Sequence, residues 1–185
     1  MNEIEVKIIG IDVDKLIARL EELGAKAIFS GIVRCLHFDF PEHTLRKNGR
    51  LMRLRRWEAE EGFKDKFEIC TKGPKEIVDG CKSREELETY VEDADKFEQL
   101  MYRLGFEATL NNDKHRRSYV LGGAHIDIDA YPGVPVYMEI EAMSSHVVDD
   151  TIELLQLQEY ERSTETANEM FKRLYPDVDF DNLKI

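Results

Sequence analysis

The sequence contains little that would mark a secreted, membrane-embedded or metal-sulfur protein. Its three cysteines, Cys35, Cys70 and Cys81, have no metal-ligand spacing and cannot form an even disulfide framework, so we expect reduced thiols and a cytoplasmic location. No apolar run approaches the length of a membrane span, and the opening Met-Asn-Glu-Ile-Glu is not a signal peptide. The five histidines form no HExxH-type cluster.

Net positive charge is also missing. The chain has 38 acidic residues against 26 lysines and arginines, for a formal net charge of −12. We therefore expect no nucleic-acid partner and no membrane partner, and an anionic ligand would need a local basic cluster. With 185 residues, 42% of them hydrophobic, the chain is long enough for a sizeable core, and we predict a single domain over 1–185.

Charged and apolar residues alternate in the first segment, Glu3-Ile4-Glu5-Val6-Lys7. In a strand this places Glu3, Glu5 and Lys7 on one face. Two carboxylates at that spacing lie roughly 7 Å apart and repel by about 2 kcal/mol at an effective dielectric near 20. A divalent cation would turn the repulsion into attraction, and carboxylate oxygens suit Mg²⁺, Mn²⁺ or Ca²⁺. Alone, the segment is more typical of a solvated edge strand.

The same alternation recurs along the chain. We predict eight strands, over 2–9, 25–40, 50–58, 64–72, 83–92, 107–121, 124–131 and 136–143. Apolar residues at helical spacing predict helices over 12–23, 93–104, 148–160 and 163–174. Residues 73–82 are interpreted as a loop, and helix propensity makes a helix over 83–90 a competing interpretation of that segment.

Most predicted strands carry charge of one or both signs on one face and apolar side chains on the other. An ordinary half-exposed sheet would mix neutral polar residues into its polar face. We therefore predict an α+β fold, a closed eight-stranded antiparallel β-barrel with a charged lumen and helices covering its apolar outside. A lumen lined by both signs suits a polyphosphate with divalent cations, since the bases would bind phosphate oxygens and the acids the metal.

In this pattern the chain resembles the CYTH superfamily, the triphosphate tunnel metalloenzymes that include class IV adenylyl cyclases and thiamine-triphosphatases. The resemblance covers residues 1 to about 145 and lies in seven short motifs: Glu3-Ile4-Glu5-Val6-Lys7, Arg53-Leu54-Arg55, Thr71-Lys72-Gly73-Pro74, Arg84-Glu85-Glu86-Leu87-Glu88, Lys114-His115-Arg116, Asp127-Ile128-Asp129 and Glu139-Ile140-Glu141. It favours a strand over 83–92. Members of the family often form dimers, so a homodimer is compatible with it.

The resemblance implies roles for these residues. Four carboxylates are implied as ligands of Mg²⁺ or Mn²⁺: Glu3, Glu5, Glu139 and Glu141. Seven bases are implied to hold the triphosphate: Lys7, Arg53, Arg55, Lys72, Arg84, Lys114 and Arg116. Catalytic roles, in supporting metal, positioning water or orienting the bases, are implied for Lys7, Glu86, Glu88, Asp127 and Asp129. One departure stands out, because family members often carry Tyr-Tyr-Asp or Tyr-Phe-Asp where this chain has His37-Phe38-Asp39. We interpret His37 as a packing residue.

Four functions fit these motifs. The leading hypothesis is a metal-dependent hydrolase acting on a small-molecule triphosphate: tripolyphosphate, a nucleoside triphosphate or thiamine triphosphate. An adenylyl cyclase, which makes cyclic AMP and pyrophosphate from ATP, would use the same charged residues. A non-catalytic binder of a polyphosphorylated ligand would keep them without turnover. A purely structural barrel with a solvated charged face is the fourth alternative.

Overall fold

The structure is a computed structural model that describes residues 2–185, with side chains described from Ile4 onward. Ten strands are present in that part of the chain: β1 (Asn2–Ile9), β2 (Lys26–Asp39), β3 (Leu51–Ala59), β4 (Lys66–Lys72), β5 (Glu76–Val78), β6 (Cys81–Val91), β7 (Glu107–Leu121), β8 (Ala124–Ala130), β9 (Tyr137–Ala142) and β10 (Glu161–Ser163). The helices are α1 (Val13–Glu22), α2 (Thr44–Lys47), α3 (Ala94–Arg103), α4 (Ser145–Leu154), α5 (Ala167–Leu174) and the 3₁₀ turn η1 (Phe180–Asn182).

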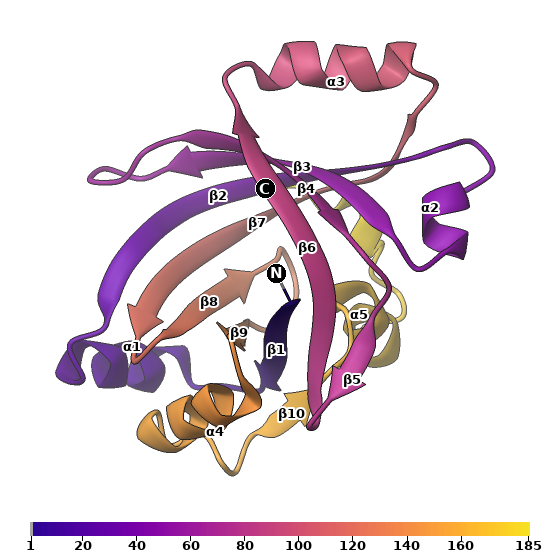
Figure 1. Ribbon diagram of the computed structural model, residues 1–185. Helices are drawn as coiled ribbons and strands as arrows, with labels where there is room; N and C mark the ends of the chain where they lie inside the picture. Colours follow the sequence, from indigo (N-terminus) through magenta and orange to yellow (C-terminus); the bar gives the residue numbers. More distant parts are fainter. Residues whose placement is uncertain (1) are drawn as a thin grey trace.

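Eight of the strands close into a barrel, which confirms the predicted fold class (Figure 1). Their order is β1-β9-β8-β7-β2-β3-β4-β6, and β6 pairs with β1 to complete the ring. Every neighbouring pair is antiparallel. The short strands β10 and β5 extend the sheet beyond β1 and β6 respectively. Closure leaves the eight barrel strands with two paired edges each along most of their length.

The apolar side of the barrel wall faces outward and is covered by helices. Val6 and Ile8 of β1 are buried against α1 and α4, which contribute Leu20 and Ile152 to the same cluster. On the opposite side, α3 packs its Met101 over β2 and β3. In Figure 1, α1 and α4 lie below the barrel and α3 lies above it. These two clusters therefore lie between the barrel and its helices, and the interior holds the charged residues together with aromatic side chains such as Trp57 and Tyr137.

Both long amphipathic helices of the first hundred residues begin where the sequence predicts. Asp12 caps α1 by accepting a hydrogen bond from the Lys15 backbone N–H at 3.2 Å, and Asp93 caps α3 in the same way from Lys96 at 2.9 Å. A short side chain with an oxygen at this position satisfies a backbone N–H that the first turn leaves free.

Two local predictions are wrong. Residues 73–82, expected to be a loop, contain β5 and the start of β6, joined by the two-residue turn Asp79-Gly80. Both turn residues have positive φ, 49° and 73°, as a type I′ hairpin turn requires. The helix expected over 148–160 is α4, which ends at Leu154, and the chain then forms β10. The expected strand over 83–92 is confirmed as β6, and the competing helix is wrong.

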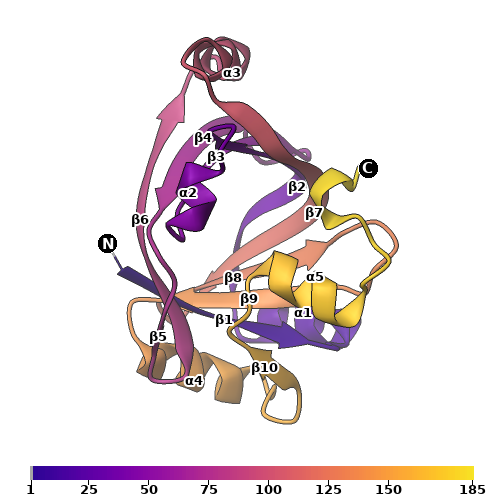
Figure 2. The ribbon, with the colours of Figure 1, turned by 90° about the vertical axis from the view of Figure 1, so that its right-hand side faces the viewer.

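α2 and α5 lie at the same end of the barrel, on the right of Figure 1 and toward the viewer in Figure 2. The hairpin between β3 and β4 lies at the other end. Among the described residues, no helix combines the length and the apolar character needed to cross a bilayer.

Replacement of Leu20 by Ala tests the placement of the core outside the barrel. Leu20 is fully buried between α1 and the wall, so we expect a loss of about 2–5 kcal/mol in the free energy of unfolding, measured by urea titration. Leu100→Ala on α3 is the control, because Leu100 is 56% exposed and its replacement should change the value by about 0.5 kcal/mol or less. Equal losses in the two variants would contradict this packing.

Candidate active site

The alternation along the barrel strands directs the predicted charged residues into one cavity of about 610 Å³. Thirteen of the predicted site residues line it: Glu5, Lys7, Arg53, Arg55, Lys72, Arg84, Glu86, Glu88, Lys114, Arg116, Asp127, Glu139 and Glu141. Asp129 is fully buried and lies against Lys114 and Arg116. The β1 backbone at Glu3 pairs with Arg84, but the Glu3 side chain lies outside the described residues.

Lys7 connects two of the predicted metal ligands. Its ammonium lies 2.8 Å from Glu5 Oε1 and 2.9 Å from Glu139 Oε1, on neighbouring strands. Burial by itself would raise the pKa of Glu5, but the attraction of Lys7 and Lys82 outweighs it and lowers that pKa to about 2. Burial would also raise the pKa of Glu139, but the attraction of nearby bases, chiefly Lys7, outweighs it and holds that pKa well below its usual range. Both carboxylates are therefore ionised at neutral pH.

Arg116 is the centre of a second group of contacts on β7, β8 and β9. It binds Asp129 through two parallel hydrogen bonds, Nε to Oδ1 and Nη2 to Oδ2, each 2.6 Å long. Its Nη2 also lies 3.0 Å from Glu139 Oε2, and its Nη1 forms an ion pair with Asp127. Lys114 donates to Asp129 Oδ2 at 2.6 Å. Bidentate contacts of this kind fix the orientation of a guanidinium.

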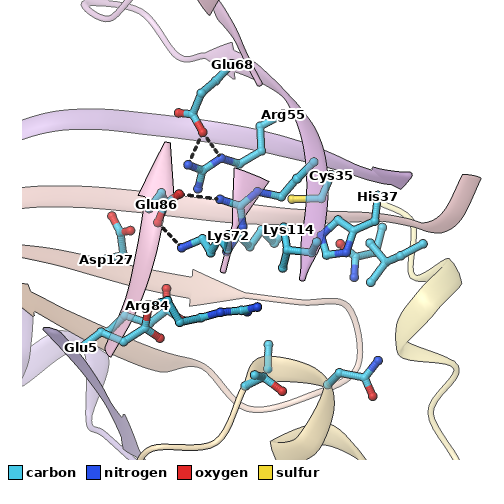
Figure 3. A pocket seen from close by; sticks show the side chains of 18 of the residues that line it. Glu5, Cys35, His37, Arg55, Glu68, Lys72, Arg84, Glu86, Lys114 and Asp127 are labelled. Carbon is cyan, nitrogen blue, oxygen red and sulfur yellow. Dashed lines mark hydrogen bonds and ion pairs between the residues drawn. The ribbon is translucent and has the colours of Figure 1, made fainter. Parts of the chain in front are cut away.

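The β3 and β4 part of the wall carries the Arg-x-Arg pair, and Figure 3 shows Arg55 of that pair with Lys72. Arg55 Nε donates to Glu68 Oε1 at 2.6 Å, and Lys72 forms an ion pair with Glu86. Arg53 is held more loosely, with Nη2 3.7 Å from Glu86 Oε1. Its buried Nε has no hydrogen-bond partner among the described residues. An unpartnered donor on a buried cation is suited to an anionic ligand, because leaving it unpaired costs free energy.

The guanidinium of Arg84 donates hydrogen bonds to two backbone carbonyls. Nε donates to the Gly73 carbonyl at 2.6 Å and Nη2 to the Gly49 carbonyl at 2.7 Å. These bonds join β6 to the segments that follow β4 and precede β3, at the end of the barrel near α2. The role of Arg84 in binding phosphate stays a prediction, while its contacts show that it holds this end of the cavity together.

Sequence reasoning did not identify Lys82 and Glu68 as site residues. Lys82 lies opposite Glu5 in the pairing of β6 with β1 and forms an ion pair with it. Burial, together with repulsion from Lys7, lowers the pKa of Lys82 to about 8. The signal that could have found it is Asp79-Gly80, a strong hairpin dipeptide that starts the next strand at Cys81 and puts Lys82 on the same face as Arg84.

His37 lines the cavity rather than packing outside it. Burial and then the positive charges of Arg53 and Arg55 lower the pKa of His37 to about 3, so the imidazole is neutral at physiological pH. Our interpretation of His37 as a packing residue is incomplete, because its ring forms part of the lumen wall (Figure 3).

The predicted metal ligands have donor chemistry that suits a divalent cation. Glu5 and Glu139 are ionised oxygen donors, and Glu141 faces the same cavity directly opposite Glu5 in the β1–β9 pairing. Hard carboxylate oxygens of this kind fit Mg²⁺ or Mn²⁺. Within the described side chains, no three acidic, histidine or cysteine groups are already assembled around one point. A cation would therefore compete with Lys7 for Glu5 and Glu139.

Fold and site together define a class of protein: a closed β-barrel whose interior is an enclosed site of paired acids and bases. The chain belongs to the CYTH domain family, whose model matches residues 1–174. A Methanocaldococcus jannaschii protein named "Putative adenylate cyclase MJ0240" is 30% identical over 147 residues, 80% of each chain.

Two solved structures share the fold. The PH1819 protein of Pyrococcus horikoshii superposes with a TM-score of 0.74 at 24% identity, covering 92% of this chain and 98% of that one. A Hippeastrum protein named a putative adenylyl cyclase, and described as having a dominant triphosphatase activity, superposes with a TM-score of 0.67 at 15% identity, covering 93% of this chain and 95% of that one. At these identities the likeness shows the fold.

Replacement of His37 by Gln tests the charge of the lumen around it. The pKa of His37 is about 3 in the folded protein against an ordinary value of 6.5, so between those pH values the side chain binds its proton mainly when the chain is unfolded. Stability should therefore fall as pH falls through this window, by at most about 1.4 kcal/mol per pH unit from this group.

The variant should lose this part of the slope, measured as the free energy of unfolding at several pH values from 3 to 6.5. The low-pKa carboxylates remain in both proteins, so the difference between their slopes isolates His37. An unchanged slope in the variant would contradict the environment described for this side chain.

Proposed function

We propose that this protein is a metal-dependent enzyme that hydrolyses a linear triphosphate, such as tripolyphosphate, a nucleoside triphosphate or thiamine triphosphate. The observation that carries the proposal is the convergence of bases from β1, β3, β4 and β7 on one cavity of about 610 Å³ whose walls also bear ionised carboxylates. A volume of this size is within the usual range for small-molecule sites. Buried bases and buried acids in one cavity suit a ligand that itself brings phosphates and cations, because each sign then has an oppositely charged group to bind.

The bases would bind the phosphate chain. Arg53 Nε has no hydrogen-bond partner among the described residues, and Nη2 lies 3.7 Å from Glu86 Oε1, so Nε is available to donate to a phosphate oxygen. Lys114 and Arg116 approach from the facing wall, oriented by Asp129. Held between these groups, the phosphates would be fixed in position and their developing charge neutralised, which supplies most of the catalysis in phosphoryl transfer.

The carboxylates would hold the metal and direct water. Glu5, Glu139 and Glu141 are the residues that would hold Mg²⁺ or Mn²⁺, which supplies charge neutralisation and polarises phosphate oxygens when bound. Asp127 accepts a hydrogen bond from Ser118 at 2.5 Å and pairs with Arg116. From this fixed position its carboxylate would orient a water molecule toward the terminal phosphorus.

Adenylyl cyclase activity is the second candidate, and the name of the Methanocaldococcus relative favours it. There the ribose 3′-hydroxyl would attack the α-phosphorus, with pyrophosphate leaving. The bases and carboxylates of the cavity would serve either reaction, since both neutralise a triphosphate. The Hippeastrum neighbour is named a putative adenylyl cyclase with a dominant triphosphatase activity, so its name links the same fold to both reactions.

Product analysis separates these functions. Tripolyphosphate, ATP and thiamine triphosphate would each be incubated with the protein and with Mg²⁺ or Mn²⁺, and phosphate, pyrophosphate and cyclic AMP measured. Release of orthophosphate is the expected result. Pyrophosphate with cyclic AMP from ATP would replace hydrolysis by cyclisation, and no turnover under any condition would leave a non-catalytic binder.

A matched pair of arginine variants on β3 tests the role of the lumen. Arg53 faces the cavity, whereas Arg56 lies on the outer side and pairs with Asp95 and Glu98 of α3. We expect Arg53→Met to lower kcat/KM for the best substrate by about 10²-fold, because it removes a donor to developing negative charge. Arg56→Met should leave kcat/KM within about twofold, since surface ion pairs contribute little. Equal effects of the two variants would exclude a lumen site.

A further inference from the structure

Four buried polar side-chain atoms have no hydrogen-bond partner within the described residues: Arg53 Nε, Trp57 Nε1, His125 Nε2 and Tyr137 Oη. Buried polar atoms are nearly always satisfied, so each exception needs a physical reason. All four residues line the charged cavity, and Trp57 and His125 also line a smaller cavity of about 330 Å³. Tyr137 is the most completely buried of the four, with 2% of its surface exposed. Its hydroxyl is therefore the one that bulk solvent is least able to satisfy.

The ring of Tyr137 is held in place inside the lumen. Tyr137 is the first residue of β9 and shares its lumen face with Glu139, because side chains alternate along a strand. Its ring stacks on that of Tyr131, with ring centres 6.4 Å apart and planes 8° from parallel. Met170 and Phe171 of α5 belong to the same buried cluster. Packing of this kind fixes where the hydroxyl lies.

The neighbouring carboxylate does not satisfy this hydroxyl. Asp129 lies directly opposite Tyr137 in the pairing of β8 with β9, yet it accepts no hydrogen bond from it. The oxygens of Asp129 are already occupied, since Oδ1 accepts from Arg116 Nε, and Oδ2 accepts from Lys114 Nζ and Arg116 Nη2. A phenol is protonated at neutral pH and can donate one hydrogen bond. Tyr137 therefore presents an unused donor next to Asp129 and the two bases that Asp129 orients.

A second unsatisfied donor, Arg53 Nε, comes from the facing wall. In the closed ring of eight strands, β9 and β3 are four places apart in either direction, so Tyr137 and Arg53 belong to opposite sides of the barrel. Both residues line the same cavity. A ligand rich in acceptors and lying between the two walls would satisfy both donors. Ionised phosphate oxygens are acceptors that form strong, charge-assisted hydrogen bonds.

We propose that Tyr137 is a substrate-binding residue whose hydroxyl donates a hydrogen bond to an oxygen of the phosphate that Lys114 and Arg116 hold. The inference rests on the proposed function and deepens it, because it adds a neutral donor to a site otherwise built from charged groups. Phenylalanine at this position would keep the ring packing and lose only the donor. The hydroxyl has no partner in the free protein, so its use lies in the complex with the ligand.

Tyr137→Phe is the test variant, and two quantities would be measured. The first is the affinity for a tripolyphosphate analogue with non-hydrolysable imido bridges, by isothermal titration calorimetry with Mg²⁺. We expect the variant to bind it about tenfold more weakly, the effect of losing one hydrogen bond to a charged group. The second is the urea midpoint of unfolding without ligand. It should equal or exceed that of the wild-type protein, because an unsatisfied buried hydroxyl costs free energy.

Tyr119→Phe is the matched control. Tyr119 lies on β7, packs against the core cluster outside the barrel and is absent from the lining of both cavities. The same chemical change at this position should leave the affinity for the analogue within about twofold. The paired measurements separate binding from structure, because a hydroxyl that supports the free protein would lower the unfolding midpoint when it is removed. A hydroxyl that serves only the ligand would not.

The outcomes distinguish this inference from the proposed function. Unchanged affinity in Tyr137→Phe would overturn the inference, and triphosphate turnover by the wild-type protein would then leave the proposed function standing. A lower unfolding midpoint, or a variant that does not fold, would also overturn the inference. Weaker binding by the variant, with no turnover of any triphosphate by the wild-type protein, would support Tyr137 as a binding residue and overturn hydrolysis. No binding of the analogue to the wild-type protein would overturn both.

Discussion

The pairing of β1 with β6 is the constraint on which the site depends. It joins the first strand of the chain to a strand about eighty residues later and closes the barrel, with Glu5 directly opposite Lys82. On its other edge β1 pairs with β9, which sets Lys7 opposite Glu139. A slip of one residue in either pairing would turn every charged side chain of β1 outward and every apolar one inward. The alternation in the sequence therefore specifies the register, and the register assembles the lumen.

Closure forces buried charges to pair with one another. Burial alone opposes ionisation of Glu5, Lys7 and Arg116, yet each remains ionised because oppositely charged neighbours outweigh that cost. Such pairs add little net stability, since desolvation offsets most of their attraction. The arrangement makes more sense as a preorganised site, where phosphates and cations could exchange partners with groups that are already ionised and oriented. Lys7 and Arg116 both form ion pairs with Glu139, so a displacement of either base would alter the contacts of the other.

The sequence was sufficient to predict the barrel because charged and apolar residues alternate in nearly every strand. A two-residue period of this kind indicates a β-strand with one charged face and one apolar face. The sequence was insufficient to predict the strands where their position depends on a hairpin turn rather than on alternation. The loop predicted over 73–82 includes Lys82, because that prediction does not treat Asp79-Gly80 as a hairpin turn. The sequence also does not show that Arg84 binds backbone carbonyls or that Trp57 lines two cavities. These depend on side-chain directions and on contacts between strands far apart in the chain. The role of the metal ligands stays a prediction, and the Glu3 side chain lies beyond what the structure describes.

The most direct test of the central claim is a crystal structure of the protein with Mn²⁺ and a non-hydrolysable triphosphate analogue, using the anomalous signal of manganese to locate the ion. The account predicts manganese beside the carboxylates of Glu5, Glu139 and Glu141, with the phosphate chain against Arg53 and Lys114 inside the barrel. Manganese and phosphates bound on the outer surface, with the ion pairs of Lys7 intact and the lumen filled by water, would contradict it.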